Sequence, residues 1–494
     1  MAQKRNQSPR AVIKQRVARE QGNRFTQGGI PVAMLYPSPY RAGMSSLGFQ
    51  WVLHLLRQAG FSAERAFLPD EPNRPDPDKL PLCTYETQTP VSHFPVIGVS
   101  LAYEIELGGL IQALQKAGIP PLRRDRGPND PRIIIGGPLT FSNPLPAAPF
   151  ADCMLLGEVE DVLIPAFTAA YEQDDTSFQA TIADLSGGYV PDLHGTNLPA
   201  VAKASPQYLP AHSQIITPDT ELRNMFLIEG ERGCHRNCHF CVMRRSTNGG
   251  MRLVDVDTIW DAVPADANRV GLVGAAISDH PKLPDILERL VQSGRGVGVS
   301  SLRADRVAHK PAIAHWLKKS GAKTLTVASD ASSQRLRTLI EKRTTEAHLK
   351  ASAEIARAEE FRLLKVYMMV GLPGETEEDL AELVSFSKEL SKIIPTALGI
   401  APFVPKRNTP LDAAPFAGIK TVEKLLKKLS KGLEGAVDVR PTSARWAWVE
   451  AMLAQGGPEM GEAVYQAMQA GGRFTHWQQA IKAVDPDTFA PWRG

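Results

Sequence analysis

The 494-residue sequence has few cysteines, no long apolar run and almost no net charge. The first residues hold no apolar signal core and no stretch approaches about 18 consecutive apolar residues, so we expect no membrane span, no secretion and a cytoplasmic location. The formal net charge of +3 excludes a protein that coats a polyanion with its whole surface. With 43% hydrophobic and 22% charged residues the chain is not disordered, and it can build globular cores.

Five cysteines in a chain of this length do not make a disulfide framework. Three of them, Cys234, Cys238 and Cys241, lie close together in a spacing typical of metal or redox chemistry. Cys83 and Cys153 stand alone, and we expect them to be small buried hydrophobic residues, not ligands. The function is therefore to be sought around the cysteine trio.

Composition and periodicity divide the chain into a basic arm at 1–28, a sheet domain at 29–205, a barrel at 221–405 and a helical C-terminal region at 406–494. The arm has almost no acidic residues, and its basic residues are Lys4, Arg5, Arg10, Lys14, Arg16, Arg19 and Arg24. A helix packed on the surface and an RNA-binding arm both fit this charge pattern.

Short apolar runs alternate with helical segments in the sheet domain, which predicts a Rossmann-like parallel sheet covered by helices. Ligands of such sheets bind where the strands end, here at Pro37–Ser46, Ser100–Glu104 and Gly136–Asn143. In the barrel segment six strand-like runs alternate with helices, and one helical stretch extends from Gln334 to Ala358. The fold class is thus α/β, with a partial (β/α)6 TIM-type barrel after the sheet domain.

The cysteine trio follows the first barrel strand in C-x3-C-x2-C spacing. Three thiolates from one loop suit a 4Fe-4S cluster that keeps one iron open, and an open metal site is typical of catalysis. Zinc is the alternative, with His235 or His239 as the fourth ligand.

With Phe240 in the second gap, this motif resembles the signature of the radical S-adenosylmethionine (radical SAM) superfamily. The resemblance implies that Cys234, Cys238 and Cys241 hold the 4Fe-4S cluster. It further implies reductive cleavage of SAM, which yields a 5'-deoxyadenosyl radical or supports methyl transfer. A flavodoxin-like or ferredoxin-like protein would supply the electron.

The resemblance covers most of the chain beyond the basic arm and extends to a radical SAM group with an N-terminal domain of the cobalamin-binding type. The runs that carry it are PSPYRAGMSSLG, IIIGGPLTFSNPLP, LLGEVED, VSSLRAD, RLRTLIEK, KVYMMVGLPGETEEDL and FVPKRNTP. It implies that Arg303 meets the SAM carboxylate beside Ser301, that Asp330 holds the ribose hydroxyls, and that Gly371 lines the adenine. Phe240 is also among the residues that the resemblance implies to bind SAM. No further catalytic residue is implied.

Two departures from the group's pattern bear on the cofactors. The usual Gly-Gly-Glu after the second barrel strand is replaced by Gly274, Ala275 and Ala276, so the SAM amino group needs another partner. The D-x-H-x-x-G motif that ligates cobalt is absent, since Asp192 and His194 are not followed by its glycine. The resemblance thus leaves cobalamin open as a third cofactor and predicts that cobalt, where bound, has no histidine ligand.

The leading hypothesis is a radical SAM enzyme, either a methyl or alkyl transferase or a C–H functionalising enzyme, acting on an RNA or a small molecule. The second hypothesis is a non-catalytic iron–sulfur or zinc protein that binds RNA or a protein partner through the basic arm and the C-terminal helices.

Overall fold

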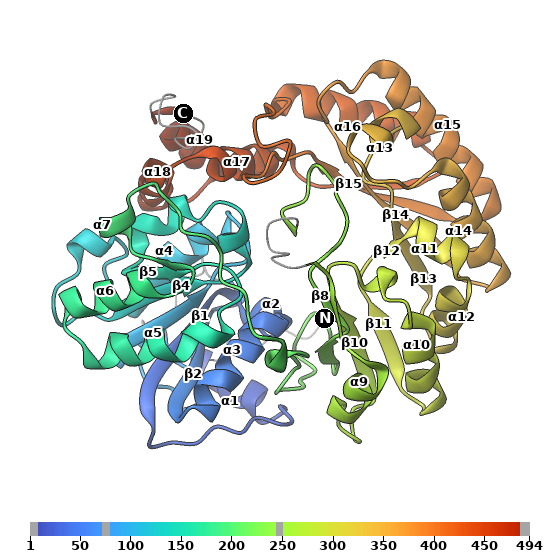
Figure 1. Ribbon diagram of the computed structural model, residues 1–494. Helices are drawn as coiled ribbons and strands as arrows, with labels where there is room; N and C mark the ends of the chain where they lie inside the picture. Colours follow the sequence, from blue (N-terminus) through green and yellow to red (C-terminus); the bar gives the residue numbers. More distant parts are fainter. Residues whose placement is uncertain (1–7, 72–79, 244–249, 485–494) are drawn as a thin grey trace. The chain divides into compact units, whose positions relative to one another are not determined.

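The computed structural model describes residues 8–71, 80–243 and 250–484 (Figure 1). The chain divides into two compact units, which are described separately below. The first comprises Met1–Phe226 and Gln455–Gly494, and the second comprises Leu227–Ala454. No helix within the described ranges is both long and apolar enough to cross a bilayer.

The first unit is built on a six-stranded sheet with the order β2-β1-β3-β4-β5-β6. Every neighbouring pair is parallel except β5 and β6. Because the chain places β2 on one side of β1 and β3 on the other, the strand order reverses between β1 and β3. The strands are β1 (Ile30–Pro39), β2 (Phe61–Leu68), β3 (Val96–Ser100), β4 (Arg132–Gly136), β5 (Cys153–Leu155) and β6 (Gly188–Tyr189).

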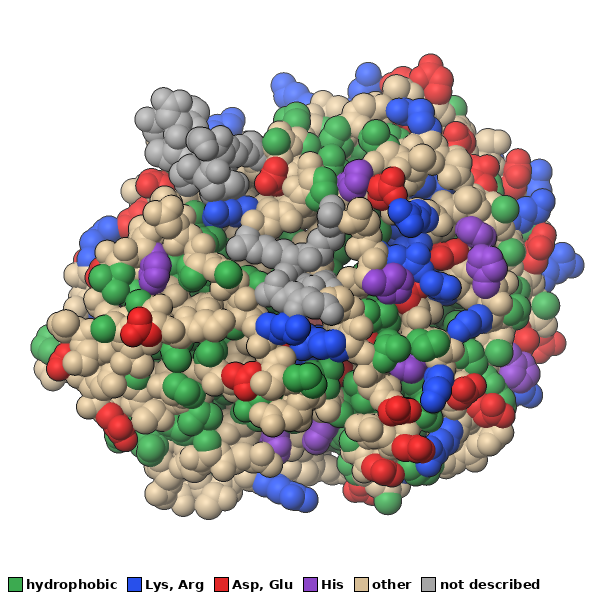
Figure 2. Space-filling view, in the orientation of Figure 1, with side chains coloured by type: hydrophobic (Ala, Val, Ile, Leu, Met, Phe, Trp, Pro, Cys, Tyr) green, Lys and Arg blue, Asp and Glu red, His purple; other side chains and the backbone are tan. Residues whose placement is uncertain are grey.

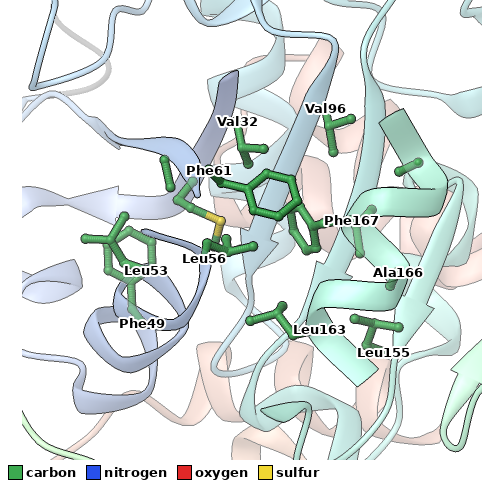
Figure 3. Packing of buried hydrophobic residues seen from close by; sticks show 14 of the residues in the cluster. Val32, Phe49, Leu53, Leu56, Phe61, Val96, Leu155, Leu163, Ala166 and Phe167 are labelled. Atoms are coloured by element: carbon green, nitrogen blue, oxygen red, sulfur yellow. The ribbon is translucent and has the colours of Figure 1, made fainter. Parts of the chain in front are cut away.

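Helices cover both faces of this sheet. On one face α3 and α5 pack together, where Phe49 and Leu53 of α3 and Leu163 and Phe167 of α5 join the buried cluster shown in Figure 3. Side chains alternate along the strands, so that Val32 of β1 points into this cluster. The helices of the unit are α1 (Pro9–Val17), α2 (Tyr40–Gly43), α3 (Leu47–Gln58), α4 (Glu106–Ala117), α5 (Glu160–Glu172), α6 (Asp175–Asp184), α7 (Pro191–His194), α18 (Pro458–Gln469) and α19 (Phe474–Lys482).

The last two helices belong to the sheet unit, which corrects the expected separate region at 406–494. Helix α18 approaches so closely that a side chain on Gly461 would overlap the carbonyl of Pro146. The ring of Trp477 in α19 lies where a side chain on Gly108 of α4 would be. Glycines at these two positions therefore allow the C-terminal helices to close onto the sheet domain.

The described part of the basic arm is also packed on this unit. Arg16 donates to Tyr85 Oη at 3.0 Å and pairs with Asp70, and Arg19 pairs with Asp219. Lys4 and Arg5 lie outside the described residues. Two of the basic side chains thus serve intramolecular ion pairs, and on the face seen in Figure 2 basic and acidic side chains are interspersed.

Strand β2 was not predicted, because its sequence FSAERAFL carries two charges that are nevertheless buried. Arg65 is 0% exposed and pairs with Glu20 at 2.8 Å and with Glu86 at 2.6 Å. Glu64 accepts from the hydroxyl groups of Thr84 and Thr87, both at 2.6 Å. Hydrogen bonds and ion pairs therefore replace the solvation that the two charges lose.

Replacing Arg65 by Met should destabilise the sheet unit by about 3–5 kcal/mol, since it leaves two buried carboxylates without their common cation. Denaturant unfolding followed by circular dichroism measures the change. The exposed pair Arg124–Glu462 provides the control, because Arg124→Ala should have only a small effect. An Arg65→Met protein as stable as the wild type would contradict the structural role of this network.

The second unit is a partial barrel of parallel strands. Its two sheets have the orders β11-β10-β7 and β12-β13-β14-β15-β16, and β8 and β9 form a separate antiparallel ladder. The strands are β7 (Phe226–Glu229), β8 (Glu231–Arg232), β9 (Arg252–Leu253), β10 (Arg269–Val273), β11 (Gly296–Val299), β12 (Leu302–Arg303), β13 (Thr324–Ala328), β14 (Leu363–Val370), β15 (Thr396–Pro402) and β16 (Asp438–Pro441). This confirms the predicted fold class, and β16 is a further strand within the region expected to be helical.

The predicted single helix from Gln334 to Ala358 is wrong. Two helices with a break between them occupy this stretch, because Glu341 and Arg343 adopt left-handed φ values of 52° and 57°. The helices of the unit are α9 (Val256–Ala262), α10 (Leu283–Gln292), α11 (Ala304–His309), α12 (Ala312–Lys319), α13 (Gln334–Leu339), α14 (Glu346–Ala358), α15 (Glu377–Ile393), α16 (Ile419–Leu433) and α17 (Ala444–Gln455).

Candidate functional site

The cysteine loop starts directly after β8. Gly233, with φ of 91°, turns the chain out of the strand ahead of the first cysteine. The backbone N–H of His239 donates to the carbonyl of Ile340 at 3.0 Å, and the His239 carbonyl accepts from Leu411 N at 3.3 Å. The loop is therefore held from two sides by segments that follow the ends of other barrel strands.

None of the three cysteines of the loop forms a disulfide, and their side chains are partly or fully buried. Burial, and to a smaller extent the charges of Cys238 and Cys234, raise the pKa of Cys241 to about 11. Burial likewise raises the pKa of Cys234, and the charge of Cys238 adds to the effect. Cys241 thus lies close enough to both other cysteines for their charges to affect its pKa.

This donor set fits the iron–sulfur cluster expected from the sequence, since three soft ligands come from one loop. Within the described ranges no three His, Cys, Asp or Glu side chains form a ready-made metal-binding group. His235 contacts Asp279 at 3.8 Å and Met251 at 3.3 Å. His235, one of the two histidines considered for the zinc alternative, therefore contacts groups other than the thiols.

A buried ionic network anchors Arg236, which lies inside the cysteine loop. Its guanidinium donates to both carboxylate oxygens of Asp279, at 2.8 and 2.6 Å, and Arg306 reaches the same carboxylate at 2.5 Å. Burial alone would raise the pKa of Asp279, but the hydrogen bonds from the two arginines lower it to about 2. Asp279 therefore stays ionised and holds the loop to the turn after β10.

Arg303, expected to meet the SAM carboxylate, lies at the end of β12 and is 7% exposed. Its Nε donates to Asp305 at 2.9 Å and its Nη2 donates to the carbonyl of Lys342 at 2.7 Å. Nη1 has no hydrogen-bond partner among the described residues and remains available to an anion. Ser301, expected beside it, is exposed between β11 and β12.

Asp330 follows β13 in a left-handed conformation, with φ of 61°. Its carboxylate pairs with the ammonium group of Lys342, which is 7% exposed. Lys342 lies between Glu341 and Arg343, the two left-handed residues of the helix break. Sequence reasoning missed Lys342, because a continuous helix would have placed it differently.

Gly371 ends β14 with φ of 81°, and its N–H donates to Glu375 at 2.5 Å. Glu375 also accepts from Ser332 in the turn after β13, so one carboxylate joins two strand ends. A side chain on Gly371 would approach Ala417 to 3.3 Å.

Phe240 packs against the small apolar cluster formed at these strand ends. The buried members of this cluster are Ala331, Leu336, Ile340, Leu372 and Phe403. An apolar wall of this kind suits a planar ring such as adenine.

The structure thus brings the predicted residues to one edge of the unit. Arg303 is the last residue of β12, and Asp330 and Gly371 follow the carboxyl ends of β13 and β14, while the cysteine loop comes after β7 and the short β8. Their expected roles toward SAM remain predictions.

Cys83 and Cys153 lie in the sheet unit. They are 6% and 0% exposed, in the manner of small buried hydrophobic residues.

The sheet unit has a separate groove, of about 1050 Å³, at the amino ends of its strands. Its arginines are already paired, since Arg126 donates to Asp152 at 2.9 Å and Arg132 donates to Asp175 at 2.7 Å. The groove therefore presents satisfied ion pairs and lies at the edge opposite to that where parallel sheets bind ligands.

Comparison with known proteins gives two family matches. The model of the N-terminal domain of radical SAM proteins matches residues 48–191, and the model of the radical SAM superfamily matches residues 228–387. An uncharacterised protein of Methanocaldococcus jannaschii is 28% identical over 420 residues, which cover 80% of this chain and 83% of that protein.

Among solved structures, the chain is similar to the cobalamin-dependent S-adenosylmethionine radical enzyme OxsB. The apo, selenomethionine-labelled form gives a TM-score of 0.52 at 13% identity and covers 91% of this chain and 71% of OxsB. The form with aqua-cobalamin bound gives a TM-score of 0.50 at 12% identity and covers 92% of this chain and 72% of OxsB. At this identity the likeness concerns the fold alone. With both family models matched in order along one chain, this protein belongs to the radical SAM superfamily and carries the N-terminal domain of radical SAM proteins ahead of the radical SAM domain.

Proposed function

We propose that this protein is a radical SAM enzyme whose Cys234, Cys238 and Cys241 hold a 4Fe-4S cluster. When bound, the cluster supplies the electron that cleaves SAM to methionine and a 5'-deoxyadenosyl radical. The observation that carries the proposal is the placement of three partly or fully buried cysteines on one loop that follows the first strands of the barrel. The reaction class is alkyl or methyl transfer or C–H functionalisation, on an RNA or a small molecule.

The residues at this edge would hold and orient SAM. Arg303 is preorganised, because Asp305 and the Lys342 carbonyl fix its guanidinium while Nη1 remains available to the SAM carboxylate. The carboxylate of Asp330, which pairs with the Lys342 ammonium, can accept hydrogen bonds from the ribose hydroxyls. Phe240 and its apolar cluster would exclude water from the reacting atoms.

Iron and sulfide analysis after anaerobic reconstitution tests the metal assignment. We expect about four iron and four sulfide per chain. One zinc per chain, without sulfide, would contradict the proposal and favour a structural metal site.

The electron donor we propose is a small acidic protein of the flavodoxin or ferredoxin type. Helix α16 packs beside Gly371 at the carboxyl edge, and its five exposed lysines offer a basic face for such a donor. They are Lys420, Lys424, Lys427, Lys428 and Lys431, of which Lys428 pairs with Glu377. Charge complementarity of this kind mainly speeds association and weakens with salt.

Cobalamin is the candidate cofactor of the sheet unit, because the similar enzyme OxsB is cobalamin-dependent. The strand order of the unit reverses between β1 and β3, and ligands of such sheets bind at this point. At this point Glu106 accepts from Ser38 Oγ at 3.0 Å and from Ala102 N at 2.7 Å. The hydroxyl of Thr140, expected to face a ligand, instead donates to the Gly137 carbonyl at 2.7 Å. Most of these polar groups thus form hydrogen bonds with one another or with the backbone of the segments at the strand ends.

His194 lies at the opposite edge of the sheet. Because β6 runs antiparallel to β5, the chain leaves β6 at the amino end of β5, and α7 follows there. His194 accepts from Val190 N at 3.0 Å and stacks on Tyr189. This position supports the prediction that cobalt has no histidine ligand from this motif.

His194→Ala should therefore leave any corrinoid spectrum of the protein unchanged. The protein is purified with hydroxocobalamin supplied, and the visible spectra of the wild type and the variant are compared. A histidine-ligated signal that disappears in the variant would contradict this placement.

A further inference from the structure

Glu231 is a buried carboxylate with only one of its oxygens satisfied. The residue is 1% exposed, and its Oε1 accepts from the backbone N–H of Ala276 at 2.6 Å. Its Oε2 is buried and has no hydrogen-bond partner within the described parts of the chain. Leaving a buried carboxylate oxygen unpaired is unfavourable, and native structures keep such groups mainly where a ligand or an ion meets them.

The acidic neighbours of Glu231 already have counter-charges. Glu229 forms two hydrogen bonds with Arg232, at 2.9 and 2.8 Å, and Asp279 forms two with Arg236. Burial, followed by the charges of Glu229 and Asp279, raises the pKa of Glu231 to about 7. A positively charged N–H donor beside Oε2 would therefore be strongly favoured.

The position of Glu231 connects it with the cofactor site. It lies three residues before Cys234, and its charge contributes to the raised pKa of that thiol. A side chain on Gly274 would overlap Oε1. The carboxylate therefore lies over Gly274 and Ala276, the segment in which this chain lacks the glutamate of the usual Gly-Gly-Glu.

We propose that Glu231 Oε2 accepts a hydrogen bond from the amino group of the methionyl part of SAM, an inference that rests on the proposed function. The first barrel strand would thus supply the carboxylate that the turn after the second strand lacks. The amino group is the part of SAM that combines positive charge with N–H donors. The sulfonium has charge but no donor, and the adenine amine has donors but no charge. Arg303, at the end of β12, would take the SAM carboxylate, so the two ends of the amino acid moiety meet opposite charges.

The test compares SAM with its analogue that lacks the α-amino group, using the reconstituted holoenzyme and equilibrium binding. E231Q keeps the side-chain size and an acceptor for Ala276 N but removes the negative charge. We expect the Kd of SAM to rise by about 10- to 100-fold in E231Q, while the Kd of the analogue stays near its wild-type value. G274A should give a change in the same direction, because it displaces the carboxylate without removing it.

E229Q is the matched control, since it removes an acidic side chain two residues away that already has Arg232 as its partner. In E229Q the ratio of the Kd of SAM to the Kd of the analogue without the α-amino group should match the ratio in the wild type. An E231Q protein with wild-type iron content and an unchanged ratio would overturn this inference alone. Absence of iron or of SAM binding in the wild-type protein would overturn the proposed function together with it.

Discussion

Replacing Cys234, Cys238 and Cys241 together by Ala should abolish both cluster binding and SAM cleavage. The three thiols are the soft ligands that the loop offers to a cluster. His235, which could replace one of them as a metal ligand, contacts Asp279. Iron content should fall from about four per chain to a background level, and no 5'-deoxyadenosine should form. Colorimetric iron and sulfide assays and chromatography of the reaction mixture measure both losses.

Cys153→Ala is the control for this loss. Cys153 is 0% exposed in β5 of the sheet unit, so the variant should lose some stability but keep its iron. Cys83→Ala should behave in the same way. Equal loss of iron in a folded Cys153→Ala protein would contradict the assignment of the loop cysteines.

Arg303→Ala should weaken SAM binding while the cluster remains. A guanidinium that meets a carboxylate forms a charge-assisted contact worth about 1.5–3 kcal/mol, which corresponds to roughly a 10- to 100-fold rise in the Kd of SAM. Arg303 also donates to the Lys342 carbonyl, so iron content and unfolding have to be measured on the same preparation. Equilibrium binding of SAM to the reconstituted protein gives the decisive value.

Arg289→Ala is a suitable control, because this exposed arginine on α10 pairs with Asp257 and is not among the residues expected to meet SAM. The affinity of the Arg289→Ala variant for SAM should equal that of the wild type. If Arg303→Ala retained its iron and bound SAM as tightly as the wild type, the role carried over from the family would be wrong at this position.

The parts of the fold that follow from local patterns could be predicted from the sequence. Continuous apolar runs such as those of β1 and β4 identify buried strands, because parallel strands are covered on both faces. The cysteine spacing with Phe240 identified the loop, since ligands of one cluster come from neighbouring positions in the chain. The resemblance to the radical SAM superfamily implied roles for Arg303, Asp330 and Gly371, and the structure places all three at the carboxyl ends of barrel strands.

The parts that depend on distant partners could not be predicted. Strand β2 carries Arg65, whose burial makes sense only with Glu20 and Glu86 beside it. The break before α14 depends on the contacts of Lys342 with Asp330 and Arg303, which override the helical pattern. In the same way, no local pattern shows that α18 and α19 join the sheet unit.

Reductive cleavage of SAM by the anaerobically reconstituted protein tests the central claim most directly. After addition of dithionite, the account predicts 5'-deoxyadenosine and methionine in equal amounts, and neither product from the variant that lacks Cys234, Cys238 and Cys241. A protein that holds its full complement of iron and sulfide, binds SAM and leaves it intact under reduction would contradict the account.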